Sequence, residues 1–335
     1  MAQYAKDQPA GFKNSVQNIA VVGAGGTVGK YVTEYLLKTG KHNVTAITRF
    51  DSTNKLPSGV VVQKVNYDEH SSLVSALTGQ DVLIITLAVM APRDTQTKLI
   101  NAAADAGVPF IIPNEWGIDT NNESLAKETI VGERVAKIRA YISSLGKSSW
   151  ITLVCSFWYE FSLGGSPSRY GFDIPNKSLV LFDDGNTKIN TSTWDQCGRA
   201  VANLLSLKLL PEDSSDKSPT ISQFRNKSVY ISSFLLSQRD MLASVLRVTG
   251  DKESDWEITS ESAKERYEKA MEELQKGDIQ ASVVVLYTRV FYRDGGGNYE
   301  GRIGLHNELL GLPTEDLDAA TKMAIDMAMR GDLAY

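Results

Sequence analysis

Residues 18–29 read NIAVVGAGGTVG, a short apolar run that ends in a cluster of glycines. The apolar run, residues 18–22, predicts a buried parallel strand, and the residues after the glycines predict a helix. Gly23, Gly26 and Gly29 recur at every third position between the two elements. Backbone without Cβ atoms lets a pyrophosphate approach the turn and the N–H groups at the helix N-terminus. The stretch therefore predicts a dinucleotide-binding βαβ unit.

The first half of the chain continues this alternation of strands and helices. Further strands are predicted at residues 44–49, 60–65, 81–88, 110–113 and 150–155, and helices at 30–38, 71–77, 95–106 and 123–145. Such alternation is typical of an α/β fold with a doubly wound parallel sheet. We therefore predict a Rossmann-type domain over residues 16–160.

The pattern changes in the second half of the chain. Residues 157–184 are aromatic and glycine-containing and have no clear period, whereas helices are predicted at 240–248, 260–277 and 319–330. We predict a smaller C-terminal α/β domain over residues 161–335 that is mainly substrate-binding. A helix at 193–207 and a strand at 228–233 are expected to return to the Rossmann domain.

Composition limits the classes of partner. The formal net charge of −5 argues against nucleic acid and anionic membranes, which call for concentrated Lys and Arg. No apolar run is long enough for a transmembrane helix, and the polar N-terminal residues do not resemble a signal peptide. The two cysteines fit a reducing compartment, and the three scattered histidines predict no metal site. We expect a cytoplasmic protein with a small hydrophobic organic substrate, and the oligomeric state stays open.

The end of the second predicted strand indicates which dinucleotide binds. NAD sites place an acidic residue there, whereas this chain has Arg49, whose guanidinium suits the 2′-phosphate of NADP(H). Asp51, two residues later, argues weakly the other way. Phe50 is a candidate cover for the adenine.

Other cofactor contacts are expected where predicted strands end, because carboxyl ends of parallel strands face the ligand crevice. Besides the glycines, these candidates are Thr27, Val28, Leu87, Ala88, Pro113, Asn114 and Phe157.

The usual proton-transfer pair of short-chain dehydrogenases is absent, since no tyrosine has a lysine four residues later. Residues 112–119, IPNEWGID, together with the glycine turn and Arg49, resemble the NmrA-like and isoflavone-reductase-like branch of atypical short-chain dehydrogenases/reductases. Residues 156–161 (SFWYEF), 184–188 (DGNTK) and 307–312 (NELLGL) are similar to fungal members. The resemblance covers about residues 18–330. It implies the Rossmann fold and NADP(H) as cofactor. The family includes reductases, redox sensors and tailoring enzymes of natural-product pathways.

The chain departs from this family at the catalytic lysine. The resemblance places the family's Lys-x-Lys-Val-Arg-Arg motif on residues 135–140, VAKIRA, so Val135 stands where the reductases carry their general acid/base. Valine cannot transfer a proton. Lys127, about two turns upstream, and Tyr159 are the remaining candidates. Asn114 replaces the serine of the family's Pro-Ser-Glu-Phe-Gly motif and is expected to bond the nicotinamide ribose or a substrate carbonyl.

Aromatic residues gather after the sixth predicted strand and suit either an apolar pocket or core packing between domains. The candidates for the substrate pocket are Trp116, Trp158, Tyr159, Phe161 and Tyr170. They indicate a large, flat substrate of aromatic or alkaloid-like character. Three functions stay open: an NADPH-dependent oxidoreductase that reduces C=N, C=C or C=O, an NADP(H)-binding cyclase, including a cycloaddition catalyst, and a non-catalytic redox-sensing regulator.

Overall fold

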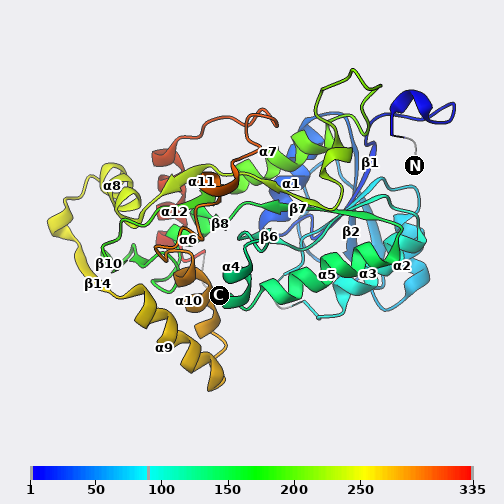
Figure 1. Cartoon of the computed structure of the whole chain (residues 1–335). Helices are drawn as coiled ribbons and strands as arrows, with labels where there is room; N and C mark the ends of the chain where they lie inside the picture. The colour runs from blue at the N-terminus through cyan, green and yellow to red at the C-terminus, as the bar shows by residue number, and fades with distance from the viewer. Residues whose placement is uncertain (1–2, 89–90, 333–335) are drawn as a thin grey trace.

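An eight-stranded parallel sheet occupies the right-hand part of the molecule in Figure 1. The computed structural model describes residues 3–88 and 91–332. The strands of this sheet are β1 (Asn18–Val22), β2 (Asn43–Arg49), β3 (Val61–Val65), β4 (Val82–Ile85), β5 (Phe110–Ile112), β6 (Trp116–Gly117), β7 (Ser149–Val154) and β12 (Lys227–Tyr230). Their order is β12-β7-β5-β4-β1-β2-β3, β6 pairs with β7, and every pairing is parallel. The doubly wound α/β fold is confirmed.

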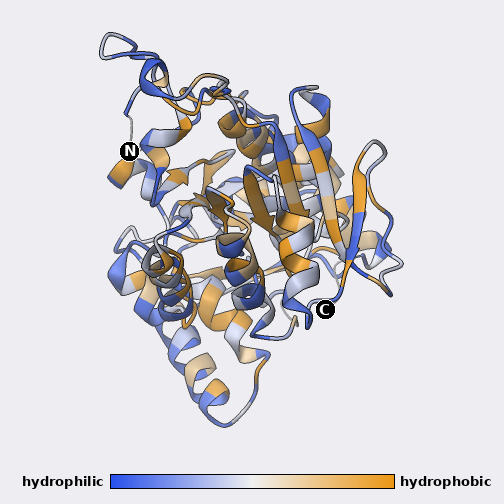
Figure 2. Cartoon of the chain, turned by 90° about the vertical axis from the view of Figure 1, so that its right-hand side faces the viewer, coloured by the Kyte–Doolittle hydropathy of each residue, from blue (hydrophilic) through white to orange (hydrophobic). Residues whose placement is uncertain are grey.

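Helices cover both faces of this sheet. One face packs against α1 (Thr27–Lys38) and α7 (Trp194–Leu205), and the other packs against α2 (His70–Leu77), α3 (Thr95–Asp105) and α5 (Gly132–Leu145). In β1, Ile19 and Val21 join the core beneath α1 and α7, whereas Ala20 and Val22 join the core on the other face. A strand buried on both faces needs apolar residues throughout, which is why the central strands β1, β4 and β5 are hydrophobic runs (Figure 2).

Two segments from the second half of the chain lie on this sheet. Strand β12 pairs with β7 at the sheet edge, and α7 packs closely on α1. The approach of the helices requires Gly198, because a Cβ there would lie 2.8 Å from the carbonyl oxygen of Tyr31. The division into two domains near residue 160 stays a prediction.

The remaining elements surround a second hydrophobic core. One small sheet contains β9 (Phe172–Asp173), β10 (Ser178–Phe182) and β14 (Glu257–Glu261), and another contains β8 (Phe157–Trp158), β11 (Ile189–Ser192) and β13 (Phe234–Leu236). The helices are α6 (Tyr159–Leu163), α8 (Gln238–Thr249), α9 (Ala263–Gln275), α10 (Ala281–Arg289), α11 (Tyr299–Ile303) and α12 (Leu317–Arg330). Short 3₁₀ turns occur at Ala5–Asp7, Ile221–Phe224 and Glu253–Asp255. Strands this short explain why residues 157–184 showed no period.

The structure corrects two predicted elements beside the site. The helix predicted at residues 123–145 is broken into α4 (Glu123–Glu128) and α5, with Ile130 in the left-handed region at φ 60°. Strand β4 ends at Ile85, so Thr86, Leu87 and Ala88 belong to a loop. Within the described residues, no helix has the length and apolar character needed to cross a membrane.

Candidate cofactor crevice and active site

The glycine turn is packed too closely for side chains. Gly23 has a φ of +81°, and a Cβ at this position would lie 2.1 Å from the carbonyl oxygen of Thr86. A Cβ on Gly29 would lie 2.1 Å from the carbonyl oxygen of Gly23. The Thr86 hydroxyl donates to the carbonyl oxygen of Val22 at 2.8 Å, which fixes the end of β4 against the turn. Both glycines are therefore required by the backbone itself.

The N-terminus of α1 is open to a ligand. Its N-cap is Gly26, no side chain caps it, and the first turn contains no acidic residue. The unpaired N–H groups and the helix dipole at such an end attract an anion. The close-packed glycines and this uncapped helix end fit a pyrophosphate group.

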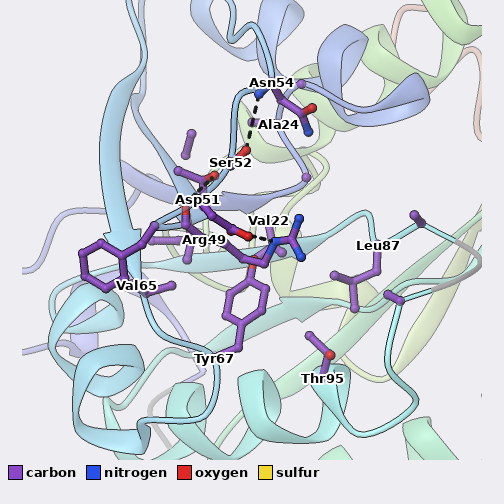
Figure 3. A pocket seen from close by; sticks show the side chains of 18 of the residues that line it. Val22, Ala24, Arg49, Asp51, Ser52, Asn54, Val65, Tyr67, Leu87 and Thr95 are labelled. Carbon is purple, nitrogen blue, oxygen red and sulfur yellow. Dashed lines mark hydrogen bonds and ion pairs between the residues drawn. The ribbon is translucent and has the colours of Figure 1, made fainter.

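A cavity of about 690 Å³ extends from this turn along the carboxyl ends of β2, β3 and β4 (Figure 3). Of the residues predicted to bind the cofactor, it is lined by Gly23, Arg49, Phe50, Leu87 and Ala88. Sequence reasoning missed other lining residues, among them Ser52, Asn54, Asn66, Tyr67, Thr95 and Lys98. Asn66 and Tyr67 directly follow β3, so the rule on strand ends, applied to that strand, would have found them.

Arg49 lies in this cavity with much of its hydrogen-bonding capacity available. Its side chain is 65% exposed, and its ion pair with Asp51 is long, at 3.6 Å. Figure 3 shows the guanidinium beside the Tyr67 ring. Burial raises the pKa of Tyr67 to about 12, so that ring stays neutral. Phe50, also exposed, offers an aromatic face at the same end of the cavity.

Asn114 joins the ends of β4 and β5. Its side-chain amide donates to the carbonyl oxygen of Leu87 at 3.2 Å and accepts from the Leu87 N–H at 3.1 Å. Its own backbone N–H donates to Gln96 at 2.8 Å. Pro113 beside it is buried, and the Trp116 indole N–H donates to the carbonyl oxygen of Ile85 at 2.8 Å. These contacts give Asn114 a positioning role in the structure as it stands.

A buried carboxyl group follows Asn114. Glu115 accepts from the Thr120 hydroxyl at 2.5 Å, and the Arg139 guanidinium lies 3.8 Å from its other oxygen. Burial raises the pKa of Glu115, and Arg139 opposes that shift. Val135, where the resemblance places the family's lysine, precedes Arg139 by one helical turn and has no ionisable group. Lys127 is exposed on α4, before the break in the helix.

Two predicted site residues lie elsewhere. Tyr159 is fully buried, its hydroxyl is 2.8 Å from that of Thr321, and burial raises its pKa far above the usual range. Tyr170 is also fully buried, with its hydroxyl 3.0 Å from that of Thr191. Both rings belong to the second hydrophobic core, the one surrounded by the two small sheets and their helices. The chain turns after β7 and directs both rings into that core. The structure thus does not bring Tyr159 to the crevice as a proton donor, nor Tyr170 as a wall. Phe157 is buried as well, with its ring stacked on Tyr287.

The other aromatic residues gather between α1, α6 and α7. We call Tyr31, Trp158, Phe161 and Trp194 the aromatic cluster, whose neighbouring ring centroids are 5.7–6.3 Å apart. Tyr31 lies one turn after Thr27, so the cluster begins one turn from the open end of α1. Tyr31 and Trp194 were not predicted, because their contact depends on α7 packing on α1.

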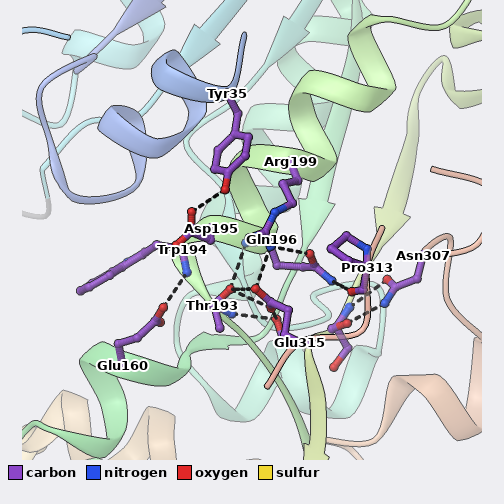
Figure 4. A network of polar contacts seen from close by, with 12 residues as sticks. Tyr35, Glu160, Thr193, Trp194, Asp195, Gln196, Arg199, Asn307, Pro313 and Glu315 are labelled. Carbon is purple, nitrogen blue, oxygen red and sulfur yellow. Dashed lines mark hydrogen bonds and ion pairs between the residues drawn. The ribbon is translucent and has the colours of Figure 1, made fainter. Parts of the chain in front are cut away.

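Glu160 lies buried beside this cluster. One carboxyl oxygen accepts from the Trp194 backbone N–H at 3.3 Å (Figure 4). Burial raises the pKa of Glu160 to about 8. Figure 4 also shows Glu315 accepting hydrogen bonds from Thr193 and Arg199, which ties the segment before α12 to the start of α7.

Comparison with known proteins places this architecture in a class. Residues 15–164 match the model of the NmrA-like family, which confirms the predicted resemblance over this part of the chain. Oxidoreductase aprR of Aspergillus flavus is 28% identical over 306 residues, which cover 90% of this chain and 96% of that protein.

Solved structures share the fold across both halves. An isoflavone reductase has a TM-score of 0.69 at 20% identity and covers 91% of this chain and 98% of its own. The structure described as AtPrR2 with NADP+ and (+)pinoresinol has a TM-score of 0.72 at 19% identity. The match covers 93% of this chain and 100% of that chain. At 19–20% identity these structures show the shared fold, and the comparisons together support an oxidoreductase with NADP(H) as cofactor.

Proposed function

We propose that this protein is an NADPH-dependent reductase of a large, flat hydrophobic substrate in natural-product biosynthesis. The observation that carries the proposal is the cavity in which Arg49 and the glycine turn lie together. A guanidinium there suits the 2′-phosphate, and the turn suits the pyrophosphate. The relative from Aspergillus flavus is an oxidoreductase by name, and AtPrR2 has been solved with NADP+.

The chain's own residues would hold the cofactor from end to end. Phe50 would cover the adenine, Arg49 would bind the 2′-phosphate, and the N–H groups of Thr27 and Val28 would bind the pyrophosphate. The backbone at Leu87, Ala88, Pro113 and Phe157 would pass along the nicotinamide half. When bound, NADPH supplies a hydride. Asn114 keeps the ends of two strands in register beside it.

The substrate would lie against the aromatic cluster. Trp158 and Phe161 are partly exposed, and Trp116 packs at the adjoining strand end. Flat aromatic faces favour a planar, apolar substrate. Exclusion of water by these rings would protect the transferred hydride and fix the orientation of the acceptor.

Proton transfer limits the kind of bond that is reduced. Val135 cannot donate a proton, Tyr159 is buried elsewhere, and Lys127 is the remaining candidate from the sequence. A protonated C=N bond needs no further acid, since the substrate already carries the charge that the hydride neutralises. We therefore favour an iminium or imine substrate, such as a nitrogen heterocycle.

The absence of an acid/base at residue 135 also favours a second candidate. A cyclase would use the cofactor-bound crevice to orient a reactive polyene or azadiene and would need no proton donor. Product formation without net NADPH oxidation distinguishes this candidate from the reductase.

Calorimetric titration with NADPH, NADP+ and NADH is the first test. A panel of aromatic imines, enones and ketones would then be added while the absorbance of the reduced nicotinamide is followed. We expect tight binding of NADPH and its oxidation by an imine. NADPH oxidation that stays at background with every compound would refute the reductase, and mass analysis of the same mixtures would test the cyclase.

A further inference from the structure

A second cavity lies at the amino ends of the sheet strands, opposite to the cofactor crevice. Its volume is about 1010 Å³, and its lining includes Asn18 at the start of β1, Asp81 just before β4 and Phe110 at the start of β5. The amino ends of these strands form its floor. The cofactor crevice uses their carboxyl ends, so the two cavities are separate.

The N-terminal segment forms one wall of this second cavity. The backbone N–H of Ala5 donates to the carbonyl oxygen of Pro211 at 2.9 Å. The Asn14 side chain donates to the carbonyl oxygen of Leu210 at 2.8 Å and accepts from the Leu210 N–H at 2.8 Å. These bonds hold Phe12 and Lys13 over the cavity. The wall is thus built by hydrogen bonds between distant parts of the chain.

A half-buried arginine without a counter-ion lies in this cavity. Arg225 donates to the Ser149 hydroxyl at 3.2 Å, and its guanidinium lies 4.6 Å from the centroid of the Phe110 ring. Across the described residues, no carboxylate lies within ion-pair distance of it, and burial alone lowers its pKa. The carboxylate in the cavity, Asp81, instead accepts from the backbone N–H groups of Gln17 and Asn18, at 2.7 and 2.8 Å.

Two other arginines of this chain, both more deeply buried, face carboxylates. Arg139 faces Glu115, and Arg289 pairs with Glu128 and Asp294. Removing a charge from water is unfavourable unless a partner compensates. A guanidinium has five N–H donors in a planar fork that matches a carboxylate, and Arg225 uses one of them here. Its unused donors define an anion site.

The rest of the lining indicates the chemical character of the anion. Pro109, Phe110, Leu209 and Leu210 are apolar, whereas Ser222 and Gln223 are polar but uncharged. Lys13 adds a second positive charge at the rim. We infer that this cavity binds a small organic anion, a carboxylate or sulfonate on a flat apolar body, with Arg225 as its counter-ion. This site goes beyond the proposed reductase and is independent of it.

Fluorescence titration with anilinonaphthalene sulfonate tests the inference, since the probe is an apolar aromatic anion. Saturating NADP+ would fill the crevice during the titration. Besides any binding at the aromatic cluster, we expect a site that Arg225→Gln weakens by about tenfold to hundredfold, which corresponds to the loss of a hydrogen bond to a charged group. Benzoate should displace the probe, whereas benzyl alcohol, which lacks the charge, should not.

A second variant leaves Arg225 in place. Gln223→Glu would add a second carboxylate to the cavity, besides Asp81, and should also weaken binding. Gln275→Glu makes the same change on exposed α9 and should not. Unchanged affinity in both Arg225→Gln and Gln223→Glu would overturn the inference, as would complete loss of probe binding on adding NADP+. If Arg225→Gln does not fold, the comparison of Gln223→Glu with Gln275→Glu decides.

Discussion

We predict that Glu160 makes the stability of this protein depend on pH. Its side chain is 2% exposed, and one of its oxygens has no hydrogen-bond partner among the described residues. Burial raises its pKa to about 8, and the carboxylates of Glu315 and Asp195 raise it further than burial alone. The folded protein therefore keeps a proton on Glu160 at neutral pH. The change that we propose is Glu160→Gln, which keeps the shape and removes the titration.

The size of the effect follows from the two pKa values. An unfolded chain releases this proton near the ordinary value of 4.5, whereas the folded chain releases it at about 8. This stabilising contribution is complete below the lower value and is lost as the pH rises toward the upper one. Each pH unit between them costs about 1.4 kcal/mol. From about pH 5 to about pH 7, wild type should lose about 3 kcal/mol relative to Glu160→Gln.

Urea unfolding of both proteins across this pH range measures the difference. The Gln variant can be less stable at the acidic end, because its amide also lacks a partner, so the change in the difference with pH is the readout. Glu308→Gln alters an exposed carboxylate and serves as the control, with a constant difference expected. A pH-independent difference for Glu160→Gln would show that Glu160 is ionised in the folded protein, which refutes the reasoning.

Three further predictions concern the site. Gly29→Ala should weaken NADPH binding by more than about tenfold in calorimetry, because its Cβ would lie 2.1 Å from the carbonyl oxygen of Gly23. Arg49→Gln should weaken NADPH binding by about tenfold to hundredfold and leave NADH binding unchanged, since a hydrogen bond to a charged phosphate is worth about 1.5–3 kcal/mol. Tyr159→Phe should lower the free energy of unfolding by about 1 kcal/mol and leave the rate of NADPH oxidation unchanged, because its hydroxyl contacts Thr321.

Matched controls keep these outcomes specific. Gly40→Ala introduces the same methyl group where no atom lies within 4 Å. The φ of +65° there strains an alanine and lowers stability, but NADPH affinity should be unchanged. Arg330→Gln removes an exposed arginine at the end of α12 and should not alter the preference between NADPH and NADH. Equal losses for both cofactors in Arg49→Gln would contradict the role given to Arg49. A large loss of activity in Tyr159→Phe would contradict its placement in the core.

The sequence by itself determined the nucleotide-binding architecture. Strand β1 has the predicted bounds, and β2, β3, β5 and β7 lie within about a residue of theirs. Strands β1 and β5 leave apolar runs because they are buried on both faces, whereas the exposed edge strand β3 is marked only by its β-branched residues. The glycine turn could also be predicted from the sequence, since its backbone geometry excludes other residues at Gly23 and Gly29. The place of Arg49 followed from the end of β2. These features are local, so a short window of sequence contains their cause.

Contacts between distant segments were decided only by the tertiary structure. Ser156 adopts a φ of 54° after β7, and the chain beyond it turns Tyr159 into the second core, which the aromatic composition did not reveal. The helix predicted at residues 123–145 is interrupted before Gly132, which packs closely against Ala126. A Cβ on Gly132 would lie 2.3 Å from the Cβ of Ala126. That Arg225 lacks a counter-ion is likewise visible only in the folded chain, where it lines one cavity with residues of the N-terminal segment. Side-chain direction and burial depend on which elements pack together, and periodicity along one element does not contain that information.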